Sequence, residues 1–163
     1  MFLTKLLDTK DDDYIIHKKI KTLFPGEQKV LFQRSGGFIT VLSEKNSETH
    51  PSKEITNLTD NQYLFSIRLN PVMNRNKGPR KVPDLKKWIE NKLNIPDTME
   101  LIPGTLSYSK ECRVSLKNDN KISLHSVFVT GALRVINKEN LFKVYQTGIG
   151  HAKGLGFGFL NLF

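Results

Sequence analysis

The order of strand-like and helix-like segments constrains the fold of this chain more than any other feature. Apolar residues recur at helical spacing in residues 12–24, and helical patterns follow in residues 84–93 and 138–147. The segments typical of strands cover residues 2–7, 29–34, 38–43, 62–69, 106–116, 121–135 and 157–163. The resulting order is β-α-β-β, a polar connector over residues 44–61 that is a loop or a degenerate helix, and then β-α-β-β-α-β.

Each half of this order matches a ferredoxin-like unit, an architecture that RNA-recognition sheets also use. We therefore predict an α+β fold with two tandem ferredoxin-like (RRM-like) units. The first unit covers residues 1–61 and is expected to be trimmed, because 163 residues leave little room for two complete units. The second unit covers residues 62–163.

Charge and cysteine content narrow the class of protein. The chain has 25 Lys and Arg against 16 Asp and Glu, a formal net charge of +9, which favours an anionic partner such as nucleic acid or an acidic membrane surface. A single cysteine, Cys112, excludes an internal disulfide and a cysteine-cluster metal site. No apolar stretch approaches the roughly 20 residues that span a bilayer. We expect a soluble, cytoplasmic protein without a membrane partner.

The first helical segment carries a continuous polar stripe. Tyr14, His17, Lys18 and Lys21 stand at positions i, i+3, i+4 and i+7, so they share one accessible helix face. Cleavage of RNA through its own 2′-hydroxyl needs a base for that hydroxyl, an acid for the leaving 5′-oxygen and positive charge near the phosphate. A histidine transfers protons near neutral pH, so this stripe fits such chemistry. An ordinary solvent-exposed histidine fits the same spacing.

A glycine-rich run covers residues 148–158 and holds five glycines, with Lys153 among them. Glycines let a backbone approach a ligand closely, although tight packing alone would also require them. The run lacks the Gly-Lys-Ser/Thr ending of a Walker loop, and no helix follows it as in a Rossmann fingerprint. The remaining histidines, His50, His125 and His151, have no ligand spacing with a carboxylate or cysteine. We therefore expect no metal and no cofactor.

A basic segment lies in the first part of the second unit. The cations Arg68, Arg75, Lys77, Arg80, Lys81, Lys86, Lys87 and Lys92 fall within 25 positions and are opposed mainly by Asp84 and Glu90. Such a concentration of charge suits a phosphate backbone, and it also occurs on a merely solvated face.

Taken together, the Tyr14-x-x-His17 pair and the glycine run 148–158 give the chain a resemblance to a known family. The chain resembles CasE, the CRISPR repeat-processing endoribonucleases of the type I-E Cascade complex in the Cas-six superfamily. The resemblance covers nearly the whole chain and includes the opening strand and helix, residues 30–34, residues 66–71 and residues 77–83.

This resemblance implies a metal-independent endoribonuclease that binds a CRISPR repeat hairpin and cleaves pre-crRNA at the base of the stem. It would then stay bound to the crRNA hairpin, together with other Cascade subunits. His17 would be the principal catalytic residue and Tyr14 its helper. The expected RNA-binding residues are Lys18, Lys21, Arg34, Arg68, Arg75, Lys77, Arg80, Lys81, Lys110, Arg113, Lys117, Lys121, Gly150, His151, Lys153, Gly154 and Gly156.

Two other functions compete with this one. The first is a subunit that binds an RNA hairpin in an assembly without cutting it; the presence of both Tyr14 and His17 argues against this, and the short connector before residue 62 argues mildly for it. The second is a nucleotide-phosphate enzyme that uses the glycine run, which the missing Walker ending and missing carboxylate pairs disfavour.

Overall fold

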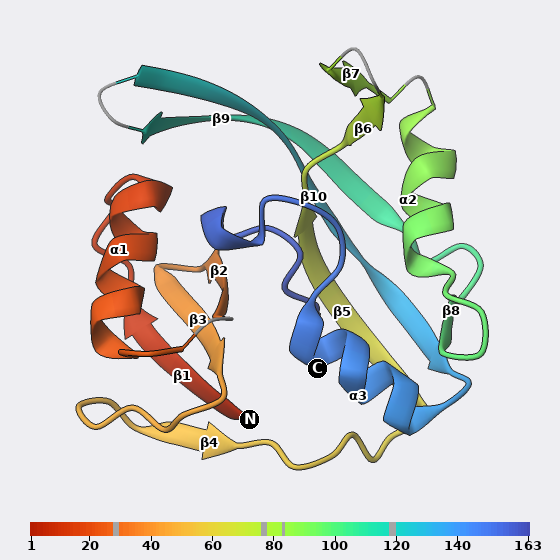
Figure 1. The fold of residues 1–163 in the computed structure, drawn as a ribbon. Helices are drawn as coiled ribbons and strands as arrows, with labels where there is room; N and C mark the ends of the chain where they lie inside the picture. Colours follow the sequence, from red (N-terminus) through yellow and green to blue (C-terminus); the bar gives the residue numbers. More distant parts are fainter. Residues whose placement is uncertain (28–29, 76–77, 83, 118–119) are drawn as a thin grey trace.

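In the computed structural model, the chain forms two main antiparallel sheets with helices packed against them (Figure 1). The structure describes residues 1–27, 30–75, 78–82, 84–117 and 120–163, and the side chains of these residues apart from 73–81 and 112–123. The predicted α+β fold of two ferredoxin-like units is confirmed.

The first sheet holds the helix that carries the polar stripe. Its strands are β1 (Phe2–Leu7), β2 (Leu31–Ser35), β3 (Phe38–Ser43) and β4 (Ser52–Glu54), in the order β2-β3-β1-β4. Helix α1 (Asp13–Leu23) packs on this sheet through Ile16 and Ile20, which are both buried. The Asp12 side chain accepts a hydrogen bond from the backbone N–H of Tyr14 at 2.8 Å, and this cap fixes the start of the helix.

The first unit is trimmed, as predicted. Residues 44–51, all of which the structure describes, contain no helix, so the second helix of the ferredoxin-like pattern is missing there. The connector instead supplies the three-residue strand β4, which pairs with β1. We had not predicted this strand, because three polar residues carry no alternating pattern.

The second sheet has the complete pattern. Its strands are β5 (Gln62–Leu69), β8 (Met99–Leu101), β9 (Ser107–Lys117), β10 (Asn120–Val135) and β11 (Asn161–Leu162), with helices α2 (Leu85–Leu93) and α3 (Lys138–Thr147). The order is β11-β5-β10-β8, and β9 pairs with the first part of β10. In both sheets, therefore, the first and third strands of the pattern lie in the middle and the second and fourth at the edges.

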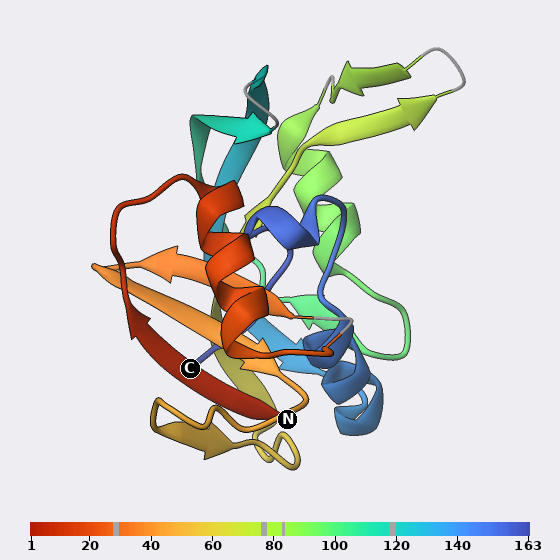
Figure 2. The ribbon, with the colours of Figure 1, turned by 60° about the vertical axis from the view of Figure 1, so that its left-hand side comes forward.

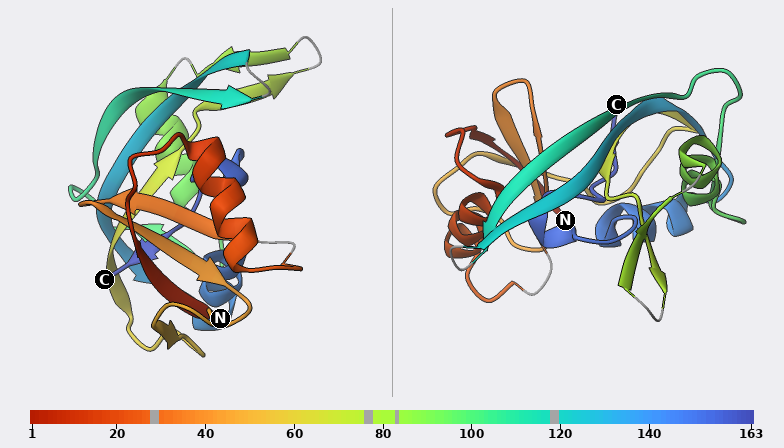
Figure 3. Two further views of the ribbon diagram at one scale, coloured as in Figure 1. Left: turned by 90° about the vertical axis from the view of Figure 1, so that its left-hand side faces the viewer. Right: turned by 90° about the horizontal axis from the view of Figure 1, so that it is seen from above.

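Three details differ from the prediction. Part of the basic segment, for which no strand was predicted between residues 69 and 84, forms a hairpin of β6 (Val72–Arg75) and β7 (Gly78–Lys81), which projects from the body of the molecule (Figure 2). The short strand β8, rather than residues 106–116, takes the second position of the pattern, and β9 extends β10 into a long hairpin that reaches α1 (Figure 3). The expected final strand, residues 157–163, has two residues in β11, and the short 3-10 helix η1 (Lys153–Leu155) lies in the glycine run.

A shared core joins the two sheets. Leu31 and Leu42 of the first sheet pack with Tyr145 of α3 and Phe159 near the end of the chain. The rings of Tyr145 and Phe159 meet edge to face, with centroids 5.9 Å apart. The boundary between residues 61 and 62 stays a prediction. No helix in the described part of the chain is long and apolar enough to cross a membrane.

Candidate active site

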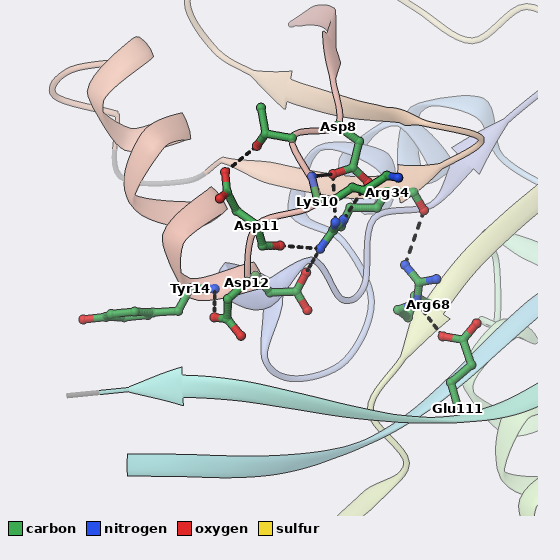
Figure 4. A network of polar contacts seen from close by, with 10 residues as sticks. Asp8, Lys10, Asp11, Asp12, Tyr14, Arg34, Arg68 and Glu111 are labelled. Atoms are coloured by element: carbon green, nitrogen blue, oxygen red, sulfur yellow. Dashed lines mark hydrogen bonds and ion pairs between the residues drawn. The ribbon is translucent and has the colours of Figure 1, made fainter. Parts of the chain in front are cut away.

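Helix α1 presents the predicted stripe beside the face that carries its buried residues. Lys18 and Lys21 are exposed, whereas Tyr14 and His17 are partly buried. The Lys18 ammonium lies 4.6 Å from the centroid of the Tyr14 ring, close enough for a cation–π contact. The tyrosine ring itself extends outward from the first turn of α1 (Figure 4). The phenol, the imidazole and two cations are therefore neighbours on one helix.

The glycine run lies directly against His17. A Cβ atom built on Gly154 would stand 3.3 Å from Cε1 of His17, so the loop backbone covers one side of the imidazole. His17 and Gly154 line a cavity of about 240 Å³ together with Lys21, Val30, Leu31, Thr147 and Lys153. The Lys153 ammonium donates a hydrogen bond to the Thr147 carbonyl oxygen at 2.6 Å. We expected His17 on an open surface, and the structure instead places it half-buried at this cavity.

The surroundings of His17 favour its neutral form. Burial lowers the pKa of the imidazole below its ordinary value of 6.5, and the positive charge of Lys21 lowers it further. Its Nδ1 atom is buried and has no hydrogen-bond partner among the described residues. A neutral imidazole at neutral pH can accept a proton.

The glycines of the run do two different things. Gly154 faces His17, whereas Gly156 has a φ of +78° and faces the core, where an added Cβ would lie 2.8 Å from the Phe32 ring. Gly158, also with a φ of +78°, approaches the Ile149 carbonyl oxygen so closely that a Cβ would stand 2.3 Å from it. Close packing therefore explains Gly156 and Gly158, whereas Gly154 borders the cavity at His17; the approach of a ligand to the glycine run stays a prediction.

A family comparison identifies the chain. A family model of CRISPR associated proteins matches residues 4–163.

The chain belongs to the CRISPR-associated protein family.

Solved structures share the fold of this CRISPR-associated protein over its full length. A CRISPR endoribonuclease Cse3 bound to a 19-nucleotide RNA matches with a TM-score of 0.84 and 18% identity, covering 100% of both chains. Cas6e from Escherichia coli str. K-12 matches with a TM-score of 0.78 and 19% identity over 99% of this chain and 98% of that one. A chain of a CRISPR RNA-guided surveillance complex matches with a TM-score of 0.76 and 17% identity over 99% and 98%. No curated protein sequence matches.

Two predicted RNA-binding arginines of this CRISPR-associated protein have partners inside the fold. The Arg34 guanidinium forms ion pairs with Asp8 at 2.8 Å and Asp13 at 3.3 Å. The Arg68 guanidinium pairs with Glu111 at 3.1 Å and lies 5.4 Å from the centroid of the Phe128 ring. The three carboxylates that pair with these arginines come from two distant parts of the chain, the segment before and at the start of α1 and strand β9, so no spacing in the sequence predicts the pairing.

The other predicted RNA-binding residues whose side chains the structure describes, Lys110, Gly150 and His151, do not line the cavity at His17. Lys110 is exposed on β9 and lines a second cavity, of about 620 Å³, with Tyr108 and His125. His151 is exposed in the glycine run, and Gly150 has a φ of +86° and lies near Leu69. Lys77 lies outside the described residues, as do the side chains of Arg75, Arg80, Lys81, Arg113, Lys117 and Lys121.

Some residues of the site were not predicted. Thr147 lines the cavity beside His17 at the end of α3, and Phe32 supports the loop beneath Gly156. Phe32 lies in an ordinary apolar strand, and nothing in the sequence around it signals a site; Thr147 directly precedes the glycine run, which is the signal that could have pointed to it. Among the described residues, no three His, Cys, Asp or Glu side chains lie close enough together to hold a metal ion.

Proposed function

We propose that this CRISPR-associated protein is an endoribonuclease that binds a CRISPR repeat RNA hairpin and cleaves it at the base of the stem without a metal ion. The half-buried His17 imidazole, which lies against Gly154 at a cavity bordered by two lysines, carries the proposal. The fold shared with the endoribonuclease Cse3 in complex with RNA supports it.

The proposed reaction uses the RNA's own 2′-hydroxyl. Its oxygen attacks the adjacent phosphorus, the bond from phosphorus to the 5′-oxygen breaks, and the products are a 2′,3′-cyclic phosphate and a 5′-hydroxyl. One group must take the proton of the 2′-hydroxyl, and one must give a proton to the leaving oxygen. His17 moves one of these protons, Tyr14 assists, and Lys21 and Lys153 contribute positive charge near the phosphate.

We further propose that the protein keeps its cleaved RNA and acts as a subunit of a Cascade-type assembly. A chain of the same fold occurs in a CRISPR RNA-guided surveillance complex, which supports this part of the proposal. The same observation favours the second candidate function, an RNA-hairpin-binding subunit that does not cut. The two candidates differ only in whether a proton-transfer residue is needed.

The experiment is a cleavage assay on a labelled CRISPR repeat hairpin with EDTA present throughout. Wild type should cut the hairpin, and His17→Ala should cut at least about 100-fold more slowly while binding the hairpin with nearly unchanged affinity, because a neutral imidazole adds little attraction for phosphate. Tyr14→Phe should lose less, since the ring stays in place.

A substrate with a 2′-deoxy nucleotide before the cut is the matched control, because it should bind normally and resist cleavage. Cleavage of that substrate, or a wild-type rate for His17→Ala, would contradict the proposed chemistry and leave the binding subunit. Activity that EDTA abolishes and a divalent ion restores would contradict metal independence.

A further inference from the structure

Strand β2 contacts both the glycine run and the segment that leads into α1, the two parts of the chain that meet at His17. Phe32 and Arg34 are two residues apart, so their side chains point to the same face of β2. Phe32 is fully buried beneath Gly156, two residues after the glycine that covers His17. Arg34 points toward the segment that leads from β1 into α1, which carries His17 (Figure 4). One strand therefore supports the loop on one side of His17 and the helix on the other.

The Arg34 guanidinium binds this segment with all three of its nitrogens. Nε and Nη2 donate to the two carboxylate oxygens of Asp8 at 2.9 Å and 2.8 Å. Nη1 donates to the Asp11 carbonyl oxygen at 2.8 Å and to the Asp13 carboxylate at 3.3 Å. The Arg34 side chain is 18% exposed, so these hydrogen bonds are largely shielded from water.

Asp13 links this network to the position of His17. It is the first residue of α1, its side chain is 4% exposed, and it stands four positions before His17, so both residues lie on one helix face a single turn apart. The Arg34–Asp13 contact therefore acts on the helix turn directly before the imidazole.

The network also reaches the second sheet. The Arg34 carbonyl oxygen accepts a hydrogen bond from Arg68 of β5 at 3.4 Å, and Arg68 pairs in turn with Glu111 of β9. The neighbouring Gln33 amide donates to the Ser66 hydroxyl at 3.0 Å in a buried contact. These hydrogen bonds thus attach strand β2 to the second sheet, whose strand β11 follows the glycine run in the chain.

We propose that Arg34 is a positioning residue for the cleavage reaction: it holds the first turn of α1 so that His17 stands correctly against Gly154, and it does not bind RNA. This inference rests on the proposed function and replaces our expectation that Arg34 contacts RNA. A shift of about 1 Å in a reacting group can cost about 100-fold in rate, so such a residue matters without touching the substrate.

Arginine is needed for this role because of its geometry. Its planar fork matches the two oxygens of Asp8 while another N–H reaches the Asp11 carbonyl, and a lysine ammonium cannot make this set of contacts from one position. Burial by itself would lower the pKa of the Arg34 guanidinium, but its hydrogen bonds to Asp8 and Asp13 raise that pKa above the ordinary value. The Arg34 guanidinium therefore keeps its positive charge in the folded protein.

The test separates rate from affinity in variants of the full chain. Arg34→Gln should lower the single-turnover cleavage rate at saturating protein by roughly 10- to 100-fold, with the dissociation constant of the hairpin changed less than about twofold. Arg34→Lys should recover part of the rate. Asp13→Asn should also slow cleavage, although the loss of a negative charge would strengthen any direct attraction for RNA.

Arg134→Gln and Glu100→Gln are matched controls, because the side chains of this ion pair in the second sheet are 57% and 45% exposed. Both variants should cleave the hairpin at the wild-type rate.

The outcomes distinguish this inference from the proposed function. A wild-type rate in folded Arg34→Gln, or a loss of affinity at an unchanged saturated rate, overturns the positioning role. A wild-type rate in His17→Ala instead overturns the nuclease. In that case, NMR signals of the His17 ring still test whether Arg34 positions the imidazole. Arg34→Gln should shift these signals, and Arg34→Lys replaces it if Arg34→Gln does not fold. The control Arg134→Gln should leave the signals unchanged. Unmoved signals contradict the inference.

Discussion

His17 illustrates how one residue acquires a particular chemistry from its surroundings. On an isolated helix it would be a solvated imidazole with an ordinary pKa. In the folded chain, the Gly154 backbone removes water from one side of the ring, and Lys21 on the next turn adds positive charge. Both effects disfavour the protonated form, so the pKa of His17 is lowered.

This lowered pKa predicts a pH dependence of stability. In the unfolded chain His17 takes up its proton near the ordinary value of 6.5, whereas in the folded chain it does so at a lower pH. As the pH falls from about 7.5 to 5, the unfolded state is protonated first, so the free energy of unfolding should fall through this window. Denaturant unfolding at several pH values should show a smaller fall for His17→Gln than for wild type.

His151→Gln is the matched control for that measurement, because His151 is exposed in the glycine run. Its stability should follow the wild-type curve. If His17→Gln and wild type have parallel curves, then burial does not disfavour the charged form of His17.

At the scale of elements, the glycine run depends on backbone shapes that other residues adopt poorly. Gly156 combines a positive φ with close contact to the Phe32 ring, so both its backbone and its missing side chain are required. Gly104, in the turn after β8, has a φ of +79°, but a Cβ there would meet no described atom within 4 Å. A substitution at Gly104 therefore measures backbone strain alone, whereas the same substitution at Gly156 measures backbone strain together with the lack of space for a side chain.

We expect Gly104→Ala to lower the free energy of unfolding by about 1–2 kcal/mol, the cost of the left-handed region for a residue with a Cβ. Gly156→Ala should lose a further ~1–3 kcal/mol, because the added methyl group forces the buried Phe32 ring to shift. Equilibrium denaturation in urea measures both. Equal losses would show that the Phe32 ring moves aside without cost.

At the scale of the whole molecule, the two sheets share a core, and the cavity at His17 lies between α1, the start of β2, the end of α3 and the glycine run. The excess of positive charge, +9 in total, lies partly in the segment of the β6–β7 hairpin, which projects from the body (Figure 2). A projecting basic hairpin is suited to contact a phosphate backbone away from the proposed active site at His17.

Changing Arg80 and Lys81 to Ala together should weaken binding of the RNA hairpin. The slope of log K against log salt should become shallower by roughly 1–2, because fewer phosphate contacts mean that fewer counterions are released from the RNA on binding. Binding titrations at several salt concentrations measure this slope. The double variant Lys53→Ala and Lys143→Ala removes the same charge from exposed positions outside the predicted RNA-binding set, and its slope should change less. Equal slopes for the two double variants would mean that net charge alone attracts the RNA.

Local patterns in the sequence predicted the elements that are long enough to show a period. Helix α1, the β2–β3 hairpin and the strands β5 and β10 lie close to their predicted bounds. The strands β4 and β8 have three residues each, too few for any alternation, and they exist because a neighbouring strand offers hydrogen-bond partners. The first unit was correctly expected to be trimmed, because chain length alone limits it.

The sequence by itself determined that Tyr14 and His17 share a helix face and that the run 148–158 needs glycine, since both follow from interactions between near neighbours in the chain. Only the tertiary structure decided that Gly154 lies against His17 and that Arg34 binds Asp8 and Asp13. Arg34 and Asp8 are 26 positions apart, and they meet because the pairing of β1, β3 and β2 sets their register. That register is fixed by burial of the whole sheet face, a property that no short segment of the sequence contains.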